Sequence, residues 1–140
     1  MLLRQRVFLD TSFIIALSNA RDPLHAKAKE LDAKLSDERV ALVLHNGILF
    51  EIGDGFARLD RRQRGMQILQ GVLADESYVV VETTDEIITA AISLFASRPD
   101  KEWGLTDCIS FTIMDNLRMT EALTADMHFT QAGFKALLLD

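Results

Sequence analysis

The sequence contains few of the residues that mark a specialised fold class. Its 140 residues include one cysteine, two prolines and seven glycines. A single cysteine cannot form an internal disulfide, so a disulfide-stapled fold is excluded and a reducing compartment is favoured. The low proline and glycine content excludes a collagen-like chain, and 49% hydrophobic residues exclude a disordered one. We therefore expect a globular protein that buries a substantial core.

Long apolar runs are also missing. No uninterrupted stretch approaches the roughly 18 to 20 apolar residues that span a bilayer. The N-terminal sequence MLLRQRVFLD lacks the apolar segment of a signal peptide. We expect a cytoplasmic protein without a membrane segment, and the length suits one domain covering residues 1–140.

Positive charge is in deficit as well. Lysine and arginine number 15 against 21 acidic residues, which gives a formal charge of −6. Taken alone, this balance argues against a partner as anionic as nucleic acid. The argument fails if some of the acids bind cations, because one or two divalent ions would offset about two to four units of charge.

Apolar segments of strand and helix type alternate along the chain. The predicted strands are residues 7–9, 41–44, 78–81, 122–124 and 136–139. Helices are expected to follow Asp10, Asp22, Asn46 and Thr84, with others over residues 66–72 and 105–114 and a charged corner at residues 60–65. Because the strands are continuous apolar runs, helices should cover both faces of a parallel sheet. The sequence therefore predicts an α/β fold.

Four acids occupy positions where the fold alone would favour an apolar or neutral residue. Asp10 ends the first strand and Asp126 follows the strand at 122–124, so both should lie at the carboxyl edge of the sheet, where α/β folds bind ligands. Glu51 lies beside the apolar stripe of its helix and should lean toward the sheet, and Asp107 opens the helix in GLTDCISF. Each acid also has a structural explanation as a helix cap, a dipole partner or an ordinary flanking residue.

If the four carboxylates converge, their repulsion must be offset. An all-oxygen site favours Mg²⁺ or Mn²⁺. The simplest chemistry for one or two such ions is hydrolysis of a phosphodiester by metal-activated water. The pattern alone leaves the structural explanations open.

Four segments in order, VFLDTSFIIAL, LFEIG, LTDCISFTIM and ALTADMHFTQAGF, resemble the acidic motifs of PIN-domain ribonucleases, in particular the VapC-type toxins of toxin–antitoxin pairs. The resemblance covers nearly the whole chain and implies a parallel sheet of about five strands. It also implies Mg²⁺- or Mn²⁺-dependent cleavage of RNA, a homodimer and neutralisation by a cognate VapB-like antitoxin.

The resemblance implies roles for particular residues. The metal pocket would consist of Asp10, Glu51, Asp107 and Asp126, and Thr11 and Ser12 would support the metal or a water. His45-Asn46 departs from the Thr or Ser often found there, which should affect substrate contacts more than metal binding.

Arginines near Glu51 are candidates for substrate binding. The cluster consists of Arg58, Arg61, Arg62 and Arg64. Arg58 should lie two turns beyond Glu51 on the same side of one helix and could guide a phosphate backbone, although a solvated helix end explains the cluster equally well. We single out Arg58 and Arg62, with His45 as a further possible substrate contact. The three histidines show no zinc-ligand spacing with Cys108.

Two alternative functions remain open at this point. One is a housekeeping PIN nuclease that processes RNA without an antitoxin. The other is a PIN-like binding module without catalytic activity, against which the presence of all four acids weighs. A phosphatase of the haloacid dehalogenase type would need a second aspartate in the segment DTS, and a receiver domain would need a lysine that is not suitably placed.

Overall fold

A computed structural model describes residues 5–140. Within them the chain forms, in order, β1 (Arg6–Leu9), α1 (Thr11–Ser18), α2 (His25–Asp37), β2 (Ala41–His45), α3 (Asn46–Gly55), α4 (Leu59–Ala74), β3 (Tyr78–Val81), α5 (Asp85–Ser97), α6 (Leu105–Asn116), β4 (Glu121–Leu123), α7 (Met127–Gln131) and β5 (Lys135–Ala136). Among the described helices, none combines the length and apolar character needed to cross a membrane.

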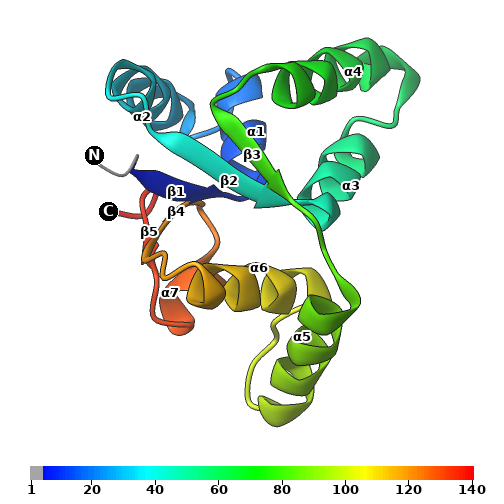
Figure 1. The fold of residues 1–140 in the computed structure, drawn as a ribbon. Coiled ribbons are helices and arrows are strands. Elements are labelled where there is room, and N and C mark those ends of the chain that lie inside the picture. The colour runs from blue at the N-terminus through cyan, green and yellow to red at the C-terminus, as the bar shows by residue number, and fades with distance from the viewer. Residues whose placement is uncertain (1–4) are drawn as a thin grey trace.

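The five strands form one parallel sheet in the order β3-β2-β1-β4-β5. The helices α1, α2 and α4 cover one face, α6 and α7 cover the other, and α5 packs against α6 (Figure 1). The chain steps from β1 outward to β3 and then returns to the other side of β1 with β4. The strand order therefore reverses between β1 and β4, which places the ligand-binding crevice of an α/β sheet at their carboxyl ends.

The centre of the sheet is fully buried. Every residue of β2 is buried, and β1 buries all but its first residue, whereas the edge strand β3 is only partly covered. On the α6 and α7 side, Phe111 packs edge-on against both Trp103 and Phe129 at 5.0 Å between ring centroids. Trp103 is therefore a core residue. The predicted α/β class and the five parallel strands are confirmed.

The segment predicted as a charged corner is helical. Helix α3 ends at Gly55, the chain turns through residues 56–58, and α4 begins at Leu59, so residues 60–65 form its first turns. Asp60 in the first turn complements the helix dipole. Gly65 allows close packing, because a Cβ there would lie 2.5 Å from the Cβ of Phe56. The expectation that Arg58 continues the helix of Glu51 is therefore wrong, since Arg58 is the N-cap residue of α4.

Several helix ends also differ from expectation. His45 rather than Asn46 caps α3, because its Nδ1 accepts a hydrogen bond from the Gly47 N–H at 3.0 Å. The side chain of Asn46 instead accepts from the backbone N–H of Thr83. The five-residue helix α7 was not expected, and β5 spans two residues where four were predicted.

Candidate metal centre

Asp10 lies between the carboxyl ends of β1 and β4. Its Oδ2 accepts hydrogen bonds from the Ser12 hydroxyl at 2.7 Å, the Thr124 hydroxyl at 2.9 Å and the Ser12 N–H at 3.3 Å. The residue is only 8% exposed. This burial raises the pKa of its carboxyl group, the hydrogen bonds from Ser12 and Thr124 oppose the rise, and the charge of Asp126 adds to it.

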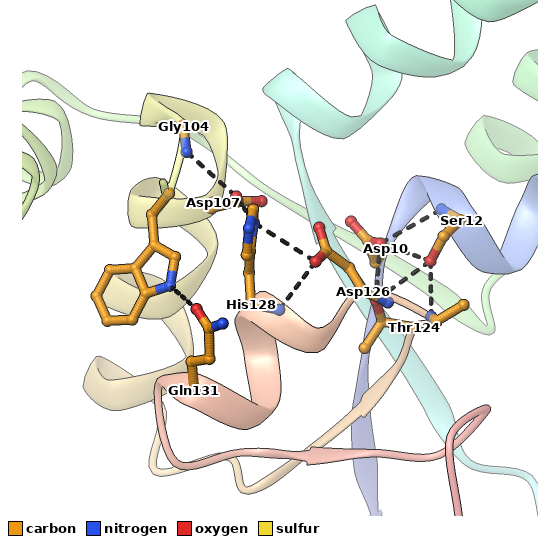
Figure 2. Close-up of polar contacts among 10 residues, drawn as sticks. Asp10, Ser12, Gly104, Asp107, Thr124, Asp126, His128 and Gln131 are labelled. Carbon is orange, nitrogen blue, oxygen red and sulfur yellow. Dashed lines mark hydrogen bonds and ion pairs between the residues drawn. The ribbon is translucent and has the colours of Figure 1, made fainter. Parts of the chain in front are cut away.

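Two hydroxyl groups connect the ends of β1 and β4. The Ser12 Oγ accepts from the Ala125 N–H at 2.9 Å, and the Thr124 Oγ1 accepts from the Asp126 N–H at 2.9 Å. The same two hydroxyls donate to Asp10, so one network fixes both strand ends (Figure 2). Ser12, predicted as a supporting residue, lies inside this network. Thr124, which the sequence analysis did not single out, has an equal place in it.

Glu51 reaches the same region from α3. Its Oε1 accepts a hydrogen bond from the Thr11 hydroxyl at 3.2 Å. The residue is exposed, so the expectation that it leans away from bulk water is wrong, although its carboxyl group is partly desolvated. That desolvation raises its pKa, as do the charges of Asp10, Asp107 and Asp126, while the Thr11 hydrogen bond opposes them. The three aspartates therefore lie close enough to Glu51 for their charges to act on it, although the group of potential ligand atoms within 4.8 Å of one another contains Asp107 and Asp126 but neither Asp10 nor Glu51.

Asp107 and Asp126 meet at His128. The His128 Nδ1 lies 2.9 Å from Asp107 Oδ2 and 3.4 Å from Asp126 Oδ1 (Figure 2). Both atoms are carboxylate oxygens, which only accept hydrogen bonds when ionised, so Nδ1 carries the hydrogen. Asp107 Oδ2 also accepts from the Gly104 N–H at 3.2 Å, and Asp126 Oδ1 accepts from the His128 N–H at 2.8 Å.

The four carboxylates follow a common rule: one oxygen is held by protein donors and the other is left open. The held atoms are Asp10 Oδ2, Glu51 Oε1, Asp107 Oδ2 and Asp126 Oδ1. No hydrogen bond from residues 5–140 reaches the second oxygen of any of them. Fixed carboxylates with open oxygens are a donor set suited to a hard divalent cation such as Mg²⁺ or Mn²⁺. The residues present therefore fit such an ion.

His128 was missed by the sequence analysis. Together with Asp107 and Asp126 it forms a group whose potential ligand atoms all lie within 4.8 Å of one another. The only sequence signal was its position two residues after Asp126, just beyond a strand end. Its partner Asp107 comes from α6, and sequence spacing does not indicate that contact.

The expected substrate-binding residues have partners within the protein. His45 is fully buried, with its Nε2 bonded to the Ser110 hydroxyl at 2.9 Å, so the expectation that it contacts substrate is wrong. Arg58 pairs with Asp60, at 3.4 Å between Nε and Oδ1, and Arg62 donates to the Ala57 carbonyl at 2.8 Å. Both arginines therefore have contacts at the α3–α4 turn.

Comparison with known proteins adds independent evidence. The model of the PIN domain family matches residues 7–135. The 23S rRNA-specific endonuclease VapC20, from two strains of Mycobacterium tuberculosis, is 28% identical over 130 residues, covering 91% of this chain and 95% of VapC20. The crystal structure of M. tuberculosis VapC20, described as a sarcin–ricin loop cleaving toxin, matches with a TM-score of 0.81 and 26% identity, covering 91% and 95% of the two chains. The chain therefore belongs to the PIN-domain family of nucleases, and its resemblance to the VapC-type toxins is confirmed.

Proposed function

We propose that this protein is an Mg²⁺- or Mn²⁺-dependent endoribonuclease and the toxin component of a type II toxin–antitoxin pair. The observation that carries the proposal is a chain of contacts near the β1/β4 crevice: Thr124 bonds Asp10 and the Asp126 N–H, and His128 joins Asp126 to Asp107. Glu51 bonds Thr11, the residue after Asp10, and each of the four carboxylates has one oxygen held and one open. The description of its relative VapC20 as a 23S rRNA-specific endonuclease supports RNA as the substrate. We also propose that the protein acts in the cytoplasm, forms a homodimer and is neutralised by a VapB-like antitoxin.

The residues that would hold the ion are Asp10, Glu51, Asp107 and Asp126. When bound, the ion would supply a water of lowered pKa and stabilise the charge that develops on the phosphate oxygens. Glu51 is the most exposed of the four acids, and its open Oε2 would hold the ion or accept a proton from water at the site. Ser12 is not needed as a nucleophile, because its Oγ is engaged by Asp10, Thr124 and the Ala125 N–H.

The Asp107→Asn variant tests the proposal. After brief expression in growing cells, sequencing of RNA 5′ ends should show new, discrete ends with the wild type and none with Asp107→Asn. Asp115→Asn is the matched control, because Asp115 is an exposed acid on the same helix and lies outside the site. Purified protein should cut the same positions with added Mg²⁺ or Mn²⁺ and none with EDTA. Full activity of Asp107→Asn, or cleavage in EDTA, would contradict the metal site.

Growth measurements distinguish the two alternative functions. A toxin should arrest growth, and co-expression of a small neighbouring open reading frame should restore it. New RNA ends without growth arrest would instead indicate a housekeeping nuclease. If the protein produces no new RNA ends and does not respond to titration with Mn²⁺, it would be a binding module.

A further inference from the structure

A second surface of interest lies near the acids, lined by both arginines and apolar residues, and we call it the arginine groove. It is an open groove of about 770 Å³ between the end of α1, the end of α3 and the start of α4. These three helices lie on the same side of the molecule (Figure 1). Three arginines line it: Arg21 from the loop after α1, and Arg61 and Arg64 from α4.

The arginine groove continues from the metal centre. On α1, Thr11 lies at the acid site and Ile15, one turn later, lines the groove. On α3, Glu51 lies at the acid site and Gly55, one turn later, also lines the groove. One helical turn is about 5.4 Å. The helices α1 and α3 therefore both lead from the acids to the arginine groove.

The three guanidinium groups are available for a ligand. Arg21, Arg61 and Arg64 are exposed, and none of their side chains makes an ion pair or hydrogen bond with residues 5–140. One acid, Asp60, also lines the groove, but Arg58 lies 3.4 Å from it and offsets its charge. The groove therefore carries unpaired positive charge on a chain whose formal net charge is −6.

We propose that the arginine groove binds the phosphate backbone of the RNA strand next to the scissile bond. The inference rests on the proposed function and assigns its substrate path. Four neighbouring carboxylates repel a polyanion, so a strand drawn to them needs cations close by. Arginine is suited to this role because its planar guanidinium can hold phosphate oxygens bidentately. The groove supplies three such groups within reach of the strand.

The test is the salt dependence of RNA binding. Fluorescence anisotropy of a labelled single-stranded oligoribonucleotide is measured over a KCl series with Mg²⁺ present, in an Asp107→Asn background that prevents cleavage. Each Arg→Gln change at positions 21, 61 and 64 should weaken binding to all sequences alike. The triple variant should lower the slope of log K against log salt by about 2, since each phosphate contact on a single strand contributes roughly 0.7.

Arg118→Gln is the matched control. It removes the same charge from an exposed position that follows α6, at the end of that helix opposite Asp107, and Arg118 does not line the arginine groove. Its salt slope should equal that of the unaltered protein, and thermal unfolding should show every variant folded. A slope lowered equally by Arg118→Gln and Arg61→Gln would overturn the proposal in favour of overall charge.

The remaining outcomes separate this inference from the proposed function. A triple variant that keeps the original affinity and slope overturns the RNA path. If that variant also loses affinity for the antitoxin, the groove belongs to an acidic protein partner. If the unaltered chain cuts RNA and the triple variant cuts with an unchanged KM, only the arginine groove assignment fails. If the unaltered chain neither binds nor cuts RNA, the proposed function fails.

Discussion

The carboxyl ends of β1 and β2 lie side by side in the sheet, yet their polar residues serve different purposes. After β1, Asp10 directs one oxygen to Ser12 and Thr124 and leaves the other open. At the end of β2, His45 uses both ring nitrogens inside the protein, with Gly47 and Ser110 as partners. A polar residue at a strand end can bind an ion or a substrate only when one of its polar atoms faces the crevice without a partner in the protein.

The two histidines near helix starts show the same contrast. His45 Nδ1 accepts from a backbone N–H, so its hydrogen lies on Nε2, whereas His128 Nδ1 faces carboxylate oxygens and carries the hydrogen itself. His45 stabilises α3 from within the core, and His128 holds two acids of the proposed metal centre. Variants at Asp10, His45 and His128 separate these roles.

The largest effect is expected for Asp10→Asn. The change keeps an oxygen for the donors of Ser12 and Thr124 but removes the negative charge that the ion needs. Mn²⁺ at 100 times its Kd should stabilise the wild type by about 2.7 kcal/mol and the variant not at all. In EDTA the variant should be at least as stable as the wild type, because burial already disfavours the Asp10 charge. Thermal unfolding with and without Mn²⁺ measures both effects, and an undiminished Mn²⁺ shift in Asp10→Asn would contradict the site.

The placement of Asp10 and Asp126 was predictable because it follows from strand ends alone. Parallel strands align their carboxyl ends, so a residue directly after a strand has a known edge even when the strand order is unknown. Glu51 and Asp107 lie on helices, and their arrival at the same edge was supported by family resemblance rather than by geometry. In the structure the charges of all three aspartates raise the pKa of Glu51, as expected for an acid in their neighbourhood.

The arginines show where sequence reasoning stops. Residues 56–58 contain no glycine or proline to mark the turn between α3 and α4, so the two helices were predicted with a wrong boundary. This error placed Arg58 beside Glu51. The cluster divides instead into residues with contacts at the turn, Arg58 and Arg62, and residues that line the arginine groove, Arg61 and Arg64.

The second effect is a pH-dependent loss of stability that comes from His45. Its burial lowers the pKa of the imidazole from 6.5 to about 4. Between these values the unfolded chain binds more protons at this site than the folded protein does, so stability is lost as pH falls from 6.5 toward 4 and is fully present above 6.5. The upper limit of the loss is about 3 kcal/mol.

His45→Asn isolates this contribution. Asparagine keeps an N-cap acceptor for the Gly47 N–H and cannot titrate in this range. The variant should be less stable at pH 7, because it loses the Ser110 contact and some core volume, but the difference from the wild type should shrink toward pH 4. Urea unfolding at several pH values in EDTA gives this difference and cancels the opposing contributions of Asp10 and Glu51. A difference that stays constant with pH would contradict the assignment.

The smallest effect should come from His128, which acts on the ion through Asp107 and Asp126. His128→Ala removes a donor from both carboxylates and should weaken Mn²⁺ binding by about 10- to 100-fold, the range usual for partners of metal ligands. The amide nitrogen of asparagine occupies the place of Nδ1, whereas that of glutamine occupies the place of Nε2. His128→Asn should therefore recover most of the affinity and His128→Gln little of it.

Calorimetric titration with Mn²⁺ distinguishes the variants. Equal affinity of His128→Asn and His128→Gln for Mn²⁺ would show that Nδ1 does not position the acids. If His128→Asn weakens Mn²⁺ binding as much as His128→Ala does, His128 would itself be a ligand of the ion. The metal centre would then include a nitrogen donor at the β1/β4 crevice.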